Sequence, residues 1–149
     1  MNRFLRIASI AMIVLMLVSF FATTALAAST GTSAASETIT VKTGGNWLVA
    51  PKLTINFQKG SGIDSDTGAT RNSYSYWTIK VYDSKGKCVQ SKINYWGSQV
   101  TITGLKRNST YKITVKEDRN NRIIGTGVLQ WKRTPSWYVG ITKNISSVR

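Results

Sequence analysis

Two aspartates spaced two residues apart, Asp64 and Asp66, are the first candidates for chemistry in this sequence. With Gly68 they have the spacing of the opening of a calcium loop, which places carboxylates at alternate positions. The twelfth position of such a loop, where a bidentate glutamate belongs, is Ser75. A glycosidase needs two carboxyl groups at least about 5 Å apart, which this pair rarely holds on a loop. We favour a flexible loop over residues 60–70, and metal binding by that loop stays open.

Cys88 is the one cysteine of the chain, and Lys85 and Lys87 precede it. Nearby cations lower the pKa of a thiol and favour the nucleophilic thiolate. The sequence contains no histidine, however, so neither a cysteine–histidine pair nor a serine–histidine triad can form. A structural thiol and a disulfide between two chains both remain open for Cys88. We predict no catalytic residue and no cofactor, we assign no residue as a metal ligand, and we expect that the protein is not an enzyme.

Positive charge is the strongest chemical feature of this chain. It has 20 Lys and Arg against 6 Asp and Glu, and its net charge is +14. A protein this basic attracts anionic partners, because its summed field raises their concentration near the surface. The cations are spread along the whole sequence, so the elements that position them decide which of them can act together.

The first 27 residues have the order of a secretory signal peptide. Arg3 and Arg6 are followed by an uncharged apolar run over residues 7–21, and Ala25 and Ala27 supply the small residues that a signal peptidase accepts. The apolar run is shorter than the roughly 20 residues that span a bilayer. We predict cleavage after Ala27 and a secreted chain of 122 residues with a net charge of +12.

After a flexible lead-in over residues 28–36, the chain is typical of β-structure. Short apolar runs alternate with polar residues, and no stretch shows the 3.6-residue period of a helix. Such alternation is typical of antiparallel sheets that are solvated on one side. We predict an all-β, antiparallel β-sandwich over residues 37–133, followed by a basic C-terminal extension over 134–149 in which Trp137 and Tyr138 are candidates for an exposed aromatic pair. About seven strands are expected, in the segments 38–42, 52–58, 77–82, 89–95, 100–103, 111–116 and 123–131.

One of these stretches carries a more specific pattern. In residues 100–115, alternating apolar residues lead to Leu105, and Tyr111 starts the next alternating run six residues later. This stretch resembles the corner between strands E and F of fibronectin type III and related immunoglobulin-like domains, with Arg107 and Ser109 where that family has proline and threonine. The resemblance implies an immunoglobulin-like sandwich in which Leu105 closes the core and the Tyr111 hydroxyl bonds to a backbone group of the corner.

The predicted strands bring three lysines to one surface. If Trp77 and Ile113 face the core, then Lys80 lies on the outer side of its strand and Lys112 and Lys116 lie on the outer side of theirs. In a sandwich of this type the two strands are neighbours in one sheet. Tyr76 and Tyr82 share that outer side. We call the set the basic face; its members are Lys80, Lys112, Lys116, Tyr76 and Tyr82.

The sequence thus predicts a secreted, non-enzymatic protein that binds an anionic extracellular partner through the basic face. The candidate partners are an anionic cell-envelope polymer, an anionic lipid surface and an acidic extracellular protein. The secretion signal argues against nucleic acid, although nucleic acid would satisfy the electrostatics. The alternative is a secreted effector, either an antimicrobial protein or an inhibitor of a hydrolase.

Overall fold

The structure is a computed structural model that describes residues 36–118, 122–124 and 127–149. The predicted signal peptide and nearly all of the predicted lead-in lie outside these residues. Within them the chain forms twelve strands and no helix. The strands are β1 (Ser36–Thr43), β2 (Lys52–Gln58), β3 (Gly60–Asp64), β4 (Thr70–Ser73), β5 (Tyr76–Tyr82), β6 (Cys88–Tyr95), β7 (Gln99–Ile102), β8 (Thr110–Glu117), β9 (Arg122–Ile124), β10 (Gly127–Arg133), β11 (Ser136–Lys143) and β12 (Ile145–Val148).

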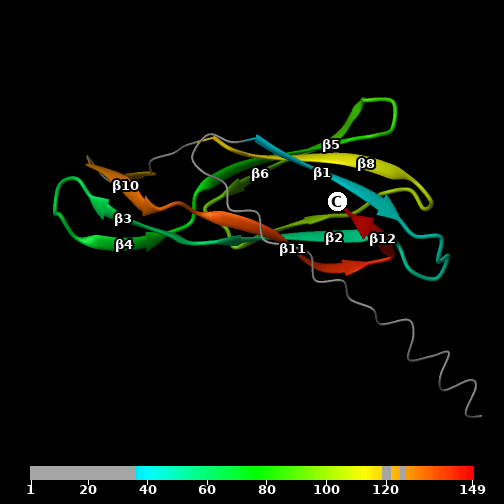
Figure 1. Cartoon of the computed structure of the whole chain (residues 1–149), viewed down its shortest axis with the longest axis horizontal. Coiled ribbons are helices and arrows are strands. Elements are labelled where there is room, and N and C mark those ends of the chain that lie inside the picture. Colours follow the sequence, from blue (N-terminus) through cyan, green and yellow to red (C-terminus); the bar gives the residue numbers. More distant parts are fainter. Residues whose placement is uncertain (1–35, 119–121, 125–126) are drawn as a thin grey trace, which may run out of the picture.

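Two antiparallel sheets enclose the core (Figure 1). The five-stranded sheet has the order β12-β1-β8-β5-β6, and the three-stranded sheet has the order β11-β2-β7. Buried apolar side chains from both sheets form one cluster, which includes Val41, Leu53, Ile55, Trp77, Ile79, Ile113 and Val115. The prediction of an all-β, antiparallel architecture is therefore confirmed, and the two facing sheets are compatible with the predicted sandwich. The expected number of about seven strands is wrong, because twelve are present in the described residues.

The period of two in the sequence determines which side chains enter this core. In β5, Trp77, Ile79 and Val81 are buried, while Lys80 between them is exposed. Phe57 of β2 packs on Trp77 across the sandwich, with their ring centroids 5.3 Å apart. Each fully buried side chain of this size contributes about 1.5–3 kcal/mol, so the alternation that sets the face also stabilises the domain.

A four-stranded sheet, β4-β3-β10-β9, extends beyond the sandwich, at the left of Figure 1. It arises because β3 follows β2 after Lys59 and pairs with β10, which leads into β11, the partner of β2. Residues 60–70, which we expected to be a flexible loop, instead contain β3 and the start of β4. The alternation of apolar and polar residues does not reveal β3, because Gly60 and Gly62 supply two of its five residues. The backbone of β10 lies where a Cβ of either glycine would be.

Two other expected boundaries differ from the structure. Residues 123–131 are not one strand, because β9 and β10 pair with each other with Ile124 opposite Gly127. Residues 134–149 are not an extension, because β11 joins the three-stranded sheet and β12 joins the five-stranded sheet. Trp137 is only 2% exposed, since on β11 it lies opposite Phe57 and enters the core.

The order of strands around β8 departs from that of an immunoglobulin domain. There strand F lies between strand C and the last strand, G. Here β8 lies between β5 and the first strand of the described chain, β1, with β12 beyond it. The flanking strand of β8 is thus supplied by β1 and not by the last strand, as it would be in that family.

Candidate functional site

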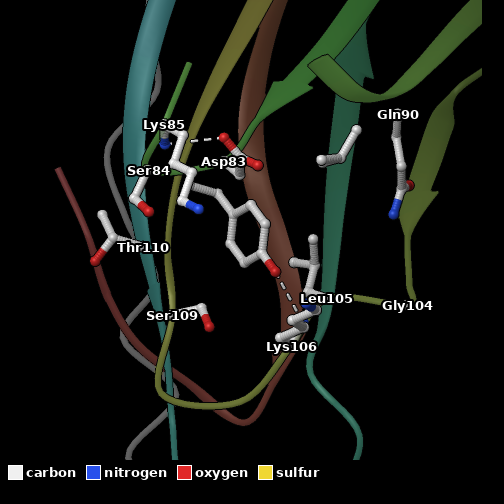
Figure 2. Close-up of a pocket in the computed structure, with 11 residues that line it drawn as sticks. Asp83, Ser84, Lys85, Gln90, Gly104, Leu105, Lys106, Ser109 and Thr110 are labelled. Carbon is white, nitrogen blue, oxygen red and sulfur yellow. Dashed lines mark hydrogen bonds between the residues drawn. The ribbon is translucent and has the colours of Figure 1, made fainter. Parts of the chain in front are cut away.

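The corner between β7 and β8 contains the predicted hydrogen bond. The backbone N–H of Lys106 donates to the hydroxyl oxygen of Tyr111 at 2.9 Å (Figure 2). Both Leu105 and Tyr111 are buried in the core cluster. Asn108 within the corner has a φ of 50°, in the left-handed region that asparagine tolerates better than most residues. The corner fixes where β8 begins and therefore which of its residues face solvent.

The register between β5 and β8 places the lysines of the basic face. Lys112 lies opposite Tyr82, and Lys116 lies opposite Thr78. Lys80 lies opposite Thr114, which is midway between the two lysines on β8. All three lysines are exposed, and Tyr76 and Tyr82 are half-buried. Diagonal neighbours on paired strands are about 7–8 Å apart, so the three lysines form a zigzag along the sheet. The structure brings the five residues to one face, and their role in binding stays a prediction.

Two further cations continue the basic face across the sheet. In β1, Thr40 lies opposite Lys112 and Lys42 lies opposite Thr110. Arg149 is paired with Thr40 through two backbone hydrogen bonds, of 2.6 and 2.9 Å. Because directly opposed residues point to the same side of a sheet, Lys42 and Arg149 extend the positive surface over β1 and β12. Sequence reasoning missed them because it did not place these strands beside β8.

One carboxylate accompanies the zigzag. Asp118 accepts a hydrogen bond from the Thr78 hydroxyl, and its Oδ1 lies 3.7 Å from Lys116 Nζ. Exposed ion pairs of this kind contribute only about 0–1 kcal/mol. An anionic partner that competes for Lys116 therefore has little to displace.

An aromatic cluster borders the basic face at the end of β6. Tyr76 contacts Tyr95 edge-to-face, with ring centroids 5.0 Å apart, and Trp96 lies 6.2 Å from Tyr76. Tyr95 is 65% exposed, and Ile93 beside it is also exposed. The side chain of Asn94 bonds to both the N–H and the carbonyl of Gly97, which fixes the turn after β6. The outer side of the sheet thus offers apolar as well as charged contacts.

A cavity of about 360 Å³ lies beside the corner (Figure 2). Asp83 and Lys85 of the β5–β6 turn lie on one side of it, and Lys106 lies on the other. The Asp83 carboxylate accepts the backbone N–H groups of Lys85 and Lys87, at 2.9 and 3.0 Å, so the turn itself uses it. With the hydroxyls of Ser109 and Thr110, the cavity offers cationic and hydroxyl groups to a small anionic group. Its walls come from two separate stretches of the chain, 83–90 and 104–111, which is why the sequence did not reveal it.

The Asp64 carboxylate serves the β3–β4 hairpin. Its Oδ1 accepts the backbone N–H of Asp66 and its Oδ2 accepts Arg71 Nε, both at 3.0 Å. The N–H of Asp66 is the main cause that lowers the pKa of Asp64, against the opposing effect of burial. The loop is thus a hydrogen-bonded turn. Within the described residues no three His, Cys, Asp or Glu side chains are grouped as a metal site would require.

Cys88 is exposed and forms no disulfide with another residue of this chain. Its thiol donates to the carbonyl oxygen of Gln90 at 3.3 Å. It lies opposite Tyr82, next to a register shift in the pairing of β5 with β6.

In the described part of the chain, no helical segment has the length and apolar character needed to span a bilayer.

Comparison with models of known protein families finds no match for this chain, and no curated protein matches it in sequence. The geometry described above gives a candidate site with three parts, which are the basic face, its aromatic border and the cavity at the corner.

Proposed function

We propose that this chain is a secreted, non-enzymatic β-sandwich protein, related in form to immunoglobulin-like domains, that binds an anionic polymer of the cell envelope through the basic face. The observation that carries the proposal is the exposed zigzag of Lys112, Lys80 and Lys116 on two paired strands. The corner hydrogen bond of Tyr111 supports the immunoglobulin-like form, although β1 takes the flank of β8 that the last strand has in that family.

The geometry of the face suits an extended polyanion. Neighbouring strands lie about 4.8 Å apart, so the fields of the three lysines overlap within the screening length of about 8 Å at physiological salt. Threonines whose hydroxyls are not used by Asp118 stand beside the lysines in the register, namely Thr38, Thr40 and Thr114. Their hydroxyls can donate to anionic oxygens that the ammonium groups attract. A chain of anionic groups lying along the sheet would meet charge and hydrogen-bond donors at successive positions.

The N-terminal leader supports an extracellular partner. A basic protein carried out of the cell meets envelope polymers, whose repeated charges reward a surface with several cations in fixed positions. The carboxylates that the described residues place near the face are few, which also favours an anionic partner.

A matched pair of triple variants tests the proposal. The chain from Ala28 onward, which holds all twelve described strands, is applied to an immobilised phosphate-bearing polysaccharide and to uncharged dextran. The variant Lys80→Gln/Lys112→Gln/Lys116→Gln should bind the charged polymer at least about tenfold more weakly, because it loses three cations that act together.

The control variant is Lys59→Gln/Lys132→Gln/Arg133→Gln, which removes the same charge from the side of the four-stranded sheet. It should retain binding within a few-fold of the unchanged chain. Equal losses in both variants would show that only net charge matters and that the basic face is not a site. Failure of the unchanged chain to bind the charged polymer at low salt would refute the function altogether.

A further inference from the structure

The loop between β1 and β2 exposes two large apolar side chains side by side. Trp47 is 78% exposed and Leu48 is 71% exposed, at the tip of residues 44–51. Single exposed apolar residues are ordinary on protein surfaces. A tryptophan and a leucine together at a projecting tip form an apolar patch, and such patches mark interaction sites.

The backbone of this tip is held in place by two distant segments. Arg107 of the corner donates from Nε to the carbonyl of Asn46 at 2.9 Å and from Nη2 to the carbonyl of Trp47 at 2.8 Å. Asn144, between β11 and β12, donates from Nδ2 to the carbonyls of Asn46 and Val49, both at 2.9 Å. These contacts are all to main-chain oxygens. The fold therefore fixes the loop while leaving both apolar side chains in solvent.

Cations surround the base of the tip. Lys106 and Arg107 lie in the corner, and Lys52 of β2 lies opposite Lys143 of β11. None of the four forms an ion pair with another described residue. Of the six carboxylates, Asp83 is the one at this end of the sandwich, and its Oδ1 is used by the turn. The apolar tip thus projects from a strongly positive end of the molecule.

We propose that Trp47 and Leu48 insert into the interface of an anionic lipid bilayer, with the four cations held against its headgroups. Indole rings favour the level of the headgroups, and basic residues near the surface are attracted by anionic lipid. A protein partner fits less well, because a stable interface buries about 800 Å² on each side and a two-residue tip is far smaller. A second copy of the chain would bring like charges together.

This membrane anchor is a separate surface from the basic face and does not depend on the function proposed for that face. Insertion of two side chains reaches only the headgroup region and leaves the bilayer intact. The protein would therefore adhere to vesicles without releasing their contents.

The test is co-sedimentation of the chain from Ala28 onward with vesicles of phosphatidylglycerol and phosphatidylcholine, and with phosphatidylcholine alone. The first 27 residues are left out because their apolar run would itself enter lipid. Trp47→Ala/Leu48→Ala should weaken binding to the anionic vesicles at least about tenfold, since each lost insertion is worth about that factor. The control Ile141→Ala, which truncates an exposed apolar residue of β11, should bind as the unchanged chain does.

A second readout locates the side chain in the membrane. Bromine-labelled lipid should quench the fluorescence of the bound chain, and Trp47→Phe should remove most of that quenching while keeping most of the binding. Quenching that persists in Trp47→Phe would overturn the proposal, as would equal binding of the tip and control variants. Absence of binding to anionic vesicles at low salt, or release of an entrapped dye, would also overturn it.

The two proposals fail separately. In the background Lys80→Gln/Lys112→Gln/Lys116→Gln, the tip substitutions must still reduce vesicle binding by the same factor. If the tip substitutions no longer reduce vesicle binding in this background, the anchor is not independent of the basic face. If the triple variant binds the polymer as the unchanged chain does, only the function proposed for the basic face is contradicted.

Discussion

Arg107 occupies the position at which the immunoglobulin-like corner has proline, and the contacts of its side chain explain this difference. The guanidinium group reaches from the corner to the β1–β2 loop and donates to two carbonyl oxygens of that loop. Proline could not do this, because it has no donor. The sequence showed the departure from the pattern but not its purpose, because the partners of Arg107 lie about 60 residues away. By contrast, the bond from Lys106 to Tyr111 was predictable, since it joins residues five apart.

The corner makes a direct prediction about stability. Tyr111→Phe removes one hydroxyl that accepts one backbone N–H, so the free energy of unfolding should fall by about 0.5–1.5 kcal/mol. Ile113→Ala should lower it by about 2–5 kcal/mol, because Ile113 is fully buried and its truncation leaves a cavity. Urea melts of the two variants measure both values.

Lys112→Ala is the matched control, because Lys112 lies between these residues on β8 and is exposed. It should change the free energy of unfolding by less than about 0.5 kcal/mol. The assigned register of β8 is wrong if Lys112→Ala proves as harmful as Ile113→Ala.

Glu117 gives a prediction about pH. It is buried on the core side of β8, opposite Trp77, and burial raises its pKa although the Ser75 hydroxyl donates to it. A carboxyl with a raised pKa in the folded state stabilises the fold below its unfolded pKa of about 4.5 and loses that contribution as the pH rises through the folded pKa. On acidification from pH 7 towards 4.5, Glu117 should therefore add stability.

Glu117→Gln removes the charge and keeps an acceptor for Ser75. The variant should be at least as stable as the unchanged chain at pH 7, and it should lack the gain on acidification that Glu117 supplies. The comparison stays above pH 4.5 because Asp64, whose pKa is lowered, loses its own contribution only as the pH falls below about 3.8. An identical pH dependence of the two chains in thermal melts would refute this role for Glu117.

Among the elements, strands with alternating apolar residues were predictable and strands without them were not. β2, β5 and β8 carry the pattern that one buried face requires, and they lie where the sequence places them. β3 carries two glycines and β4 has the sequence Thr-Arg-Asn-Ser, so neither shows an apolar face. They become strands because the chain runs from β2 into β3 and from β10 into β11, so that β3 meets β10 beyond the sandwich and β4 pairs with β3. Only tertiary structure holds that information.

Gly62 should therefore matter to the four-stranded sheet more than to the core. Gly62→Ala places a Cβ against the carbonyl of Gln130 and the side chain of Leu129. The pairing of β3 with β10 must shift, and backbone amides of β10 should lose protection from hydrogen exchange by at least about tenfold. Amides of Ile113 and Val115 in the sandwich should keep theirs, because the two regions have separate buried contacts.

Gly68→Ala is a useful comparison, because a Cβ there meets nothing but Gly68 has a φ of 65°. It should strain only the turn before β4. A uniform loss of protection across both β10 and β8 in Gly62→Ala would contradict the view that the four-stranded sheet opens on its own.

For the whole molecule, the important quantity is where the charge lies and not its total. A net charge of +14 is read directly from the sequence, and it predicts an anionic partner without locating a site. The sequence predicted that β5 and β8 are neighbours with these lysines on their outer sides, and the register of the two strands in the structure places the three lysines on one face. Lys42 and Arg149 could not be assigned in advance, because the pairing of β1 and β12 joins the two ends of the described chain. The loop tip at Trp47 was missed because the two residues that fix its backbone, Arg107 and Asn144, are distant in the sequence.

The most direct test of the basic face is the salt dependence of binding to a phosphate-bearing polysaccharide. Each cation that neutralises a phosphate releases a counterion, so the slope of log K against log salt counts the contacts. Lys80→Gln/Lys112→Gln/Lys116→Gln should flatten this slope by roughly two to three units relative to the unchanged chain, at about 0.7–0.9 units per lost contact. The control Lys59→Gln/Lys132→Gln/Arg133→Gln should leave the slope nearly unchanged. An unaltered slope in the first variant, or the same flattening in both, would contradict a site on the basic face.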